Sequence, residues 1–128
     1  MNINSLKLDF TLCSVGDIVF FADSRQIQKV SDYTGDEKGI CIKLNEVFGF
    51  ESPDQADRQV VFSIKCNKDI KFNIITDCIL DSVEIDVYDI KPLPPLVEKY
   101  AFAKGIWGMV SYRTRMVFIV DFLMLLAK

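Results

Sequence analysis

Two separate stretches of the sequence alternate between apolar and polar residues, and this alternation constrains the fold more than any other feature. The first stretch is LKLDFTL at residues 6–12, and the second is VVFSIKC at residues 60–66. A period of two places every second side chain on one side of a strand, so each stretch predicts a half-buried strand. A turn and a returning apolar segment follow each stretch, with SVGD at 14–17 and NKD at 67–69 as the turns. The sequence therefore predicts two β-hairpins.

The segment after each hairpin spaces its apolar residues more widely. These segments are DSRQIQKVSDY at 23–33 and TDCILDSVEI at 76–85, and each begins with residue types that cap helices. We expect a turn or two of helix in each segment. Alternation returns at Val83, Ile85 and Val87, which predicts a further strand with one wet face.

An apolar strand closes each half of the chain, at residues 40–50 and 116–126. Asn45 and Asp121 hold matching places within these strands, and both are N-cap residue types before a short apolar run. The order of hairpin, short helix, strand and capped helix thus occurs twice. We predict a mainly β fold of two small SH3-like antiparallel β-barrels packed together, with short helices, because a barrel closes its own edges.

Pro92, Pro94 and Pro95 are three of the four prolines of the chain and lie between predicted strands. Proline fixes φ and has no N–H, so this run cannot continue a ladder inside a sheet. We expect an extended strap that leads from one barrel to the last strand pair. Two other interpretations stay open, namely a proline-rich ligand motif and a connector that also borders a partner surface.

The 128 residues suit a single domain over 1–128, and the composition is globular, with 50% hydrophobic and 26% charged residues. Nucleic acid is set aside as a partner, because the net charge is −3 and no basic cluster occurs. The N-terminus does not resemble a signal peptide, and Asp121 interrupts the C-terminal apolar run. We expect a cytoplasmic protein without direct membrane insertion.

The chain contains no histidine and no glycine-rich phosphate loop, which excludes histidine-assisted nucleophiles and phosphate cradles. We therefore expect no catalytic residue, no cofactor and no metal, and hence no enzyme. The carboxylates of Glu84, Asp86 and Asp89 are interpreted as a solvated strand face. The cysteines lack metal-binding spacing and are expected to be small, reduced residues within strands: Cys13, Cys41, Cys66 and Cys78.

Three segments follow one another in a characteristic order, namely IKLNEVF at 42–48, VVFSIKCNKDIKFNII at 60–75 and GMVSYRTRMVFIVD at 108–121. With this order of segments, nearly the whole chain resembles the CheW-like domain family. The resemblance implies a non-enzymatic adaptor in chemotaxis-type signal transduction. The implied partners are the regulatory domain of a CheA-like histidine kinase and the cytoplasmic tips of chemoreceptors.

One departure from the family pattern lies in the first half, where only residues 31–39 separate the first predicted short helix from the predicted strand that begins at residue 40. That half lacks a counterpart of the proline run and of residues 105–112, so we expect its barrel to be smaller or more open. In the family this region borders the groove that meets chemoreceptors. An alternative function is therefore a degenerate CheW-like protein that self-associates, as a homodimer, or binds a single partner.

If the first half lacks this region, any binding surface should fall around the last strand pair. Trp107 is either a core residue or a partner-facing anchor, since tryptophan is common in both settings. Arg113 and Arg115 form either a solvated turn end or a contact for an acidic partner. The candidate partner-binding residues are Leu96, Ile106, Trp107, Tyr112, Arg113 and Arg115.

Overall fold

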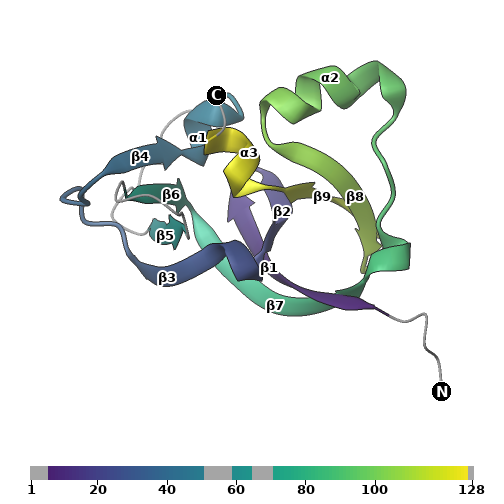
Figure 1. Ribbon diagram of the computed structural model, residues 1–128, viewed down its shortest axis with the longest axis horizontal. Coiled ribbons are helices and arrows are strands. Elements are labelled where there is room, and N and C mark those ends of the chain that lie inside the picture. Colours follow the sequence, from purple (N-terminus) through teal and green to yellow (C-terminus); the bar gives the residue numbers. More distant parts are fainter. Residues whose placement is uncertain (1–5, 51–58, 65–70, 127–128) are drawn as a thin grey trace.

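Two β-sheets lie side by side in the computed structural model of the protein, which describes residues 6–50, 59–64 and 71–126 (Figure 1). The five-stranded sheet has the order β7-β1-β2-β9-β8, and the four-stranded sheet has the order β3-β5-β6-β4. The predicted loop at 51–58, the turn at 67–69 and Cys66 lie outside the described residues. The strands of the larger sheet are β1 (Lys7–Val15), β2 (Ile18–Asp23), β7 (Cys78–Asp86), β8 (Ile106–Tyr112) and β9 (Arg115–Val120). Those of the smaller sheet are β3 (Ile27–Asp32), β4 (Ile40–Lys43), β5 (Val60–Ile64) and β6 (Phe72–Thr76).

Both predicted hairpins are confirmed, because β1 pairs antiparallel with β2 and β5 pairs antiparallel with β6. Gly16 turns the first hairpin with a φ of 56°. Its N–H donates to Oδ2 of Asp77 at 2.8 Å, and a Cβ at this position would lie 2.7 Å from the Phe50 ring. Only glycine therefore fits both the backbone conformation and the space at this turn.

The prediction of helix within residues 76–85 is wrong, because this segment forms the edge strand β7. Leu12 pairs with Asp81 while Cys13 pairs with Ile79, so Leu80 is the extra residue of a β-bulge. The bulge breaks the period-two pattern, which explains why the sequence does not look like a strand here. In the matching segment of the first half, only a 3₁₀ turn, η1 (Ser24–Gln26), forms before β3 begins.

The two halves of the chain exchange strands between the sheets. β3 and β4 follow the first hairpin in sequence but pair with β5 and β6, whereas β7, β8 and β9 join β1 and β2. This exchange makes the β2–β9 and β4–β6 pairs parallel, whereas the other strand pairs are antiparallel, which agrees with the expectation of mostly antiparallel sheets. The mainly β architecture with two SH3-like sheets is as predicted, although the strands of the described residues do not close either sheet into a hydrogen-bonded barrel.

A shared apolar core fills the space between the two sheets. The helices α1 (Leu44–Val47) and α3 (Phe122–Leu126), which follow β4 and β9, also contribute side chains to it. Its buried members are Cys13, Val15, Phe20, Ala22, Leu44, Phe62, Ile64, Ile74, Val120, Phe122 and Leu125. A second apolar core is formed by side chains of the five-stranded sheet alone. Its buried members are Phe10, Leu12, Phe21, Ile85, Val110, Val117 and Ile119.

The two short helices begin differently, which corrects the predicted match between Asn45 and Asp121. Asp121 accepts hydrogen bonds from the N–H groups of Leu123 and Met124, at 2.9 and 3.3 Å, and so caps α3. The N-cap of α1 is Lys43, which makes no capping hydrogen bond with its side chain, and Asn45 lies buried inside that helix. The residue of the first half that corresponds to Asp121 is therefore Lys43, two residues before Asn45.

Pro92 and Pro94 lie in an extended strap, as predicted. The strap connects the 3₁₀ turn η3 (Val87–Asp89) to a helix that the sequence analysis did not predict. Lys91 and Met109 exchange backbone hydrogen bonds at 2.7 and 3.0 Å, which tie the strap to β8. The strap approaches closely because Gly108 has no Cβ, which would lie 3.2 Å from Ile90. Helix α2 (Pro95–Ala103) then starts with Pro95, whose fixed φ and missing N–H suit the first helical position.

The first half does not form a smaller barrel of its own, but the sheet that receives its β3 and β4 has fewer strands among the described residues than the other sheet. In the larger sheet β8 pairs with β9 on the side opposite β2, whereas β4 has no described strand on the side opposite β6. No described segment of the first half corresponds to β8.

Gln26 of η1 links the two halves of the molecule. Its Nε2 donates to Oδ1 of Asp121 at 2.7 Å, and its Oε1 accepts from the Phe122 N–H at 3.0 Å. The change Gln26→Ala should lower the free energy of unfolding by about 1–3 kcal/mol, because it removes two partly buried hydrogen bonds and leaves the Phe122 N–H without its acceptor. Urea denaturation measures this difference, and Gln28→Ala on the exposed part of β3 is the matched control. Equal losses in the two variants would contradict this role for Gln26.

Candidate interaction site

The six candidate residues lie in two groups at opposite ends of β8. Leu96, Ile106 and Trp107 lie on α2 or at the start of the strand, and Tyr112, Arg113 and Arg115 lie at the β8–β9 turn. At about 3.3 Å of rise per residue, the Cα atoms of Trp107 and Tyr112 are roughly 17 Å apart. The candidate site thus consists of two separate surfaces, and whether either binds a partner stays a prediction.

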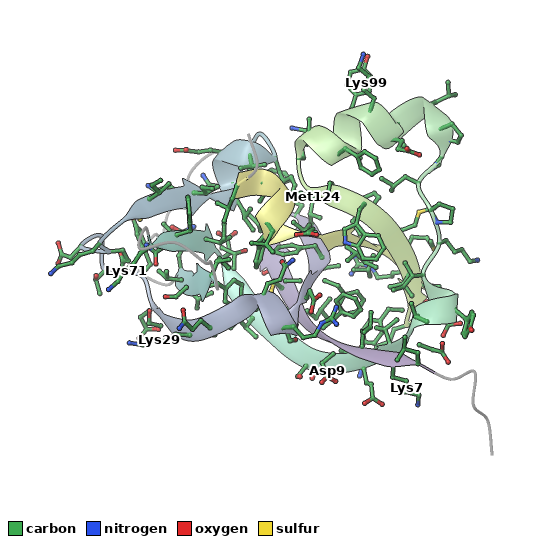
Figure 2. The ribbon with its side chains drawn as sticks, in the orientation of Figure 1. Lys7, Asp9, Lys29, Lys71, Lys99 and Met124 are labelled. Carbon is green, nitrogen blue, oxygen red and sulfur yellow. The ribbon has the colours of Figure 1, made fainter. Side chains whose placement is uncertain are left out.

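Helix α2 forms the first surface and lies at the rim of the molecule above β8 (Figure 1). None of its residues is buried, and Leu96 and Tyr100 are 90% and 74% exposed. With about 100° of rotation per residue, Leu96, Val97 and Tyr100 share one side of the helix, which we call the α2 face. Lys99 of the same helix points away from the molecule (Figure 2). The sequence reading found only Leu96, because it took this segment for part of the strap.

Ile106 and Trp107 are half-buried at the start of β8. Ile106 packs against the core between the sheets, and Trp107 packs against the core of the five-stranded sheet. Of the two interpretations left open for Trp107, these contacts favour the core residue.

The second surface begins at the β8–β9 turn, where Arg113 and Thr114 have φ values of 48° and 65°. A two-residue turn with positive φ at both positions favours Asn-Gly, and a β-branched residue such as threonine is rare there. Tyr112 packs edge-on against Phe21, with ring centroids 5.4 Å apart. The guanidinium of Arg113 lies 5.2 Å from the Tyr112 ring centroid, in a cation–π arrangement.

A pocket of about 190 Å³ lies beside this turn. Its lining residues are Leu12, Val19, Leu80, Tyr112, Arg113, Arg115 and Val117. The bulge in β7 places Leu80 at this pocket, and bulges often redirect a side chain in this way. The sequence analysis identified the three residues near the turn, and Val117 follows them on β9, but Leu12, Val19 and Leu80 join them only through strand pairing.

The charges at the pocket are those of Arg113 and Arg115, which are both exposed and form no ion pair within the described part of the chain. The ion pairs found there are Lys7 with Glu84 at 3.7 Å and Arg25 with Asp23 at 2.8 Å. Asp81 is the acidic neighbour, and its Oδ2 accepts a long hydrogen bond of 3.4 Å from the Tyr112 hydroxyl.

The described cysteines lie in strands, as expected, but Cys41 and Cys78 are exposed and only Cys13 is buried. Burial, with a smaller contribution from Cys78, raises the pKa of the Cys13 thiol well above its usual value. The thiolate is the reactive form, so this residue is not a nucleophile at neutral pH. Across residues 6–50, 59–64 and 71–126, no three Cys, Asp or Glu side chains converge as a metal site would require.

The fold resembles that of a CheW scaffolding protein. The crystal structure of the scaffolding protein TtCheW from Thermoanaerobacter tengcongensis superposes with a TM-score of 0.67 at 14% sequence identity, covering 90% of this chain and 89% of that chain. No family profile matches the sequence, and no curated protein matches it either. The superposition on TtCheW nevertheless shows that the chain has a CheW-like fold. None of the helices in its described part has the length and apolar character needed to cross a membrane.

The β8–β9 turn generates a prediction about stability. Replacing Arg113 and Thr114 together by Asn and Gly should raise the free energy of unfolding by about 1–3 kcal/mol, because both new residues adopt positive φ more readily. Thermal and urea unfolding test this change. A variant no more stable than the natural chain would show that the turn is not strained.

Trp107 generates a second prediction about stability. Trp107→Ala should lower the free energy of unfolding by about 3 kcal/mol, near the lower end for a packed aromatic residue, because Trp107 is only half-buried. The control is Tyr100→Ala on the exposed side of α2, which should change it by less than about 0.5 kcal/mol. Similar small losses in both variants would contradict the core assignment.

Proposed function

We propose that this protein is a non-enzymatic adaptor of chemotaxis-type signal transduction, acting as a single CheW-like domain over residues 1–128. Its partner is the regulatory domain of a CheA-like histidine kinase, and it works in the cytoplasm. The observation that carries the proposal is the likeness to the TtCheW scaffolding protein over 90% of the chain. Because sequence identity is only 14%, the partner is inferred from the fold and from the surface that this chain exposes.

The α2 face supports the proposal as the surface that the kinase domain covers. Leu96, Val97 and Tyr100 are large apolar residues on a helix of nine residues that buries none of its side chains. Such a short helix is marginal by itself in water, so covering its apolar side would also stabilise it. Tyrosine is among the residue types that most often dominate binding energy at interfaces.

A second candidate function is a self-associating or single-partner CheW-like module, and the outer edge of β4 favours it. The Ile40 N–H donates to the carbonyl of Lys71 beside β6, so the N–H groups of Cys41 and Lys43 point to the other side of the strand. Ile40 and Cys41 are exposed there. Antiparallel pairing of two β4 strands would join two copies through this edge as a homodimer.

Contact with chemoreceptor tips is the further role that the resemblance suggests. In the family, the groove that meets receptors is bordered by the region that the first half of this chain lacks. We propose kinase coupling as the primary role for this reason, with receptor binding as an additional property of the complex.

Binding to the regulatory domain of a CheA-like kinase from the same organism tests the proposal. Leu96→Ser should raise the dissociation constant at least about tenfold, since an interface anchor contributes more than about 1.4 kcal/mol. Isothermal titration calorimetry measures the constant, and Leu6→Ser, at another exposed leucine, is the matched control. Absence of binding by the natural chain would refute kinase coupling, and equal affinity in both variants would place the interface away from α2.

Sedimentation equilibrium separates the second candidate from the first. If the chain itself dimerises through β4, Cys41→Pro should shift it to monomer, because proline removes an outward N–H from the strand edge. The adaptor proposal expects a monomer before and after this change.

A further inference from the structure

The pocket beside the β8–β9 turn is independent of the α2 face, because it lies at the other end of β8. Its volume of about 190 Å³ is well below the roughly 300–1,000 Å³ of pockets that enclose small-molecule ligands. The space suits one aliphatic side chain. Leu12, Val19, Leu80 and Val117 supply the apolar lining for such a side chain.

The charged residues of the pocket specify what should accompany that side chain. Arg113 and Arg115 both line the pocket, and both lack an ion-pair partner among the described residues. Both side chains are exposed beside the apolar lining, so their guanidinium groups can reach a ligand bound in the pocket. Guanidinium groups bind carboxylates through paired N–H donors, so the matching ligand carries a carboxylate next to its aliphatic group.

The mouth of the pocket is also ordered before any ligand arrives. The Tyr112 ring is held by Phe21 on one side and by the Arg113 guanidinium on another. The Tyr112 hydroxyl contacts Asp81, whose carboxylate forms no ion pair with either arginine. Less freedom is therefore lost when a ligand binds.

The turn retains Arg113 and Thr114 at φ values where asparagine and glycine are the favoured residues. Unfavourable backbone conformations of this kind tend to occur at functional positions. Of the two turn residues, Arg113 supplies one of the two positive charges that line the pocket.

We infer that this pocket binds an acidic segment of a partner protein, in which a leucine-sized aliphatic side chain enters the pocket and a neighbouring Glu or Asp side chain pairs with Arg113 and Arg115. The pocket thus gives the protein a second interaction surface, selective for an aliphatic residue beside a carboxylate.

Titration of the ¹⁵N-labelled full chain with short blocked peptides tests this inference. The probe is acetyl-Ala-Leu-Glu-Ala-amide, and the comparisons are the same peptide with Gln in place of Glu and with Ser in place of Leu. The acidic leucine peptide should give saturable amide shifts at Leu80, Tyr112 and Val117, with affinity at least about fivefold higher than either comparison peptide. Equal affinities, shifts confined to other regions such as the α2 face, or no shifts at millimolar peptide would overturn the inference.

Charge variants show which residues recognise the carboxylate. Arg115→Gln should weaken the probe peptide at least about fivefold and reduce the effect of salt on binding, whereas Lys29→Gln on β3 removes one charge elsewhere and should leave affinity unchanged. Thr114→Gly should keep full affinity, because it relaxes the turn and retains both arginines. Arg113→Asn suits the positive φ, so its loss of affinity would reflect the missing charge and not unfolding of the turn. Full affinity in both arginine variants would contradict the proposed carboxylate contact.

Discussion

The exchange of strands between the two sheets is the constraint on which the rest of the structure depends. Each half of the chain begins one sheet with a hairpin and then completes the other sheet, through the parallel pairs β2–β9 and β4–β6. The residues between the sheets, including Phe20, Phe62 and Phe122, are buried only when both sheets are present. Neither half can therefore bury its apolar residues alone, and the two sheets should fold as a cooperative unit.

The position of β8 follows from this arrangement. β9 pairs with β2 of the first hairpin, and β8 pairs with the other side of β9. A bridge between Met109 and Lys91 ties β8 to the strap. One strand thus carries α2 at its beginning and the turn at Arg113 and Thr114 at its end. A single well-packed element holds two exposed surfaces of different chemistry, one apolar and one with two unpaired arginines. This arrangement fits a protein that contacts more than one segment of a partner or more than one partner.

The sequence predicted those parts of the fold that depend on local pattern. Alternation revealed both hairpins, and the prolines revealed the strap. Helix α2 was missed because Pro95 looked like a continuation of the proline run, although proline also suits the first position of a helix. The second part of β7 was predicted from the alternation at Val83 and Ile85, but its beginning was missed because the bulge at Leu80 interrupts the pattern. Of the pocket, Tyr112, Arg113 and Arg115 were predictable because they are neighbours in sequence, whereas Leu12, Val19 and Leu80 meet them only through strand pairing that no local pattern specifies.

Hydrogen–deuterium exchange of the full chain, alone and with the regulatory domain of a CheA-like kinase, tests the adaptor assignment most directly. The apolar side of α2 is exposed in the free protein, so its amides should exchange quickly and then become strongly protected when the kinase domain covers it. The account predicts protection of residues 95–103 in the complex and unchanged exchange in β3. Unchanged exchange along α2, or protection confined to β3 and β4, would contradict it.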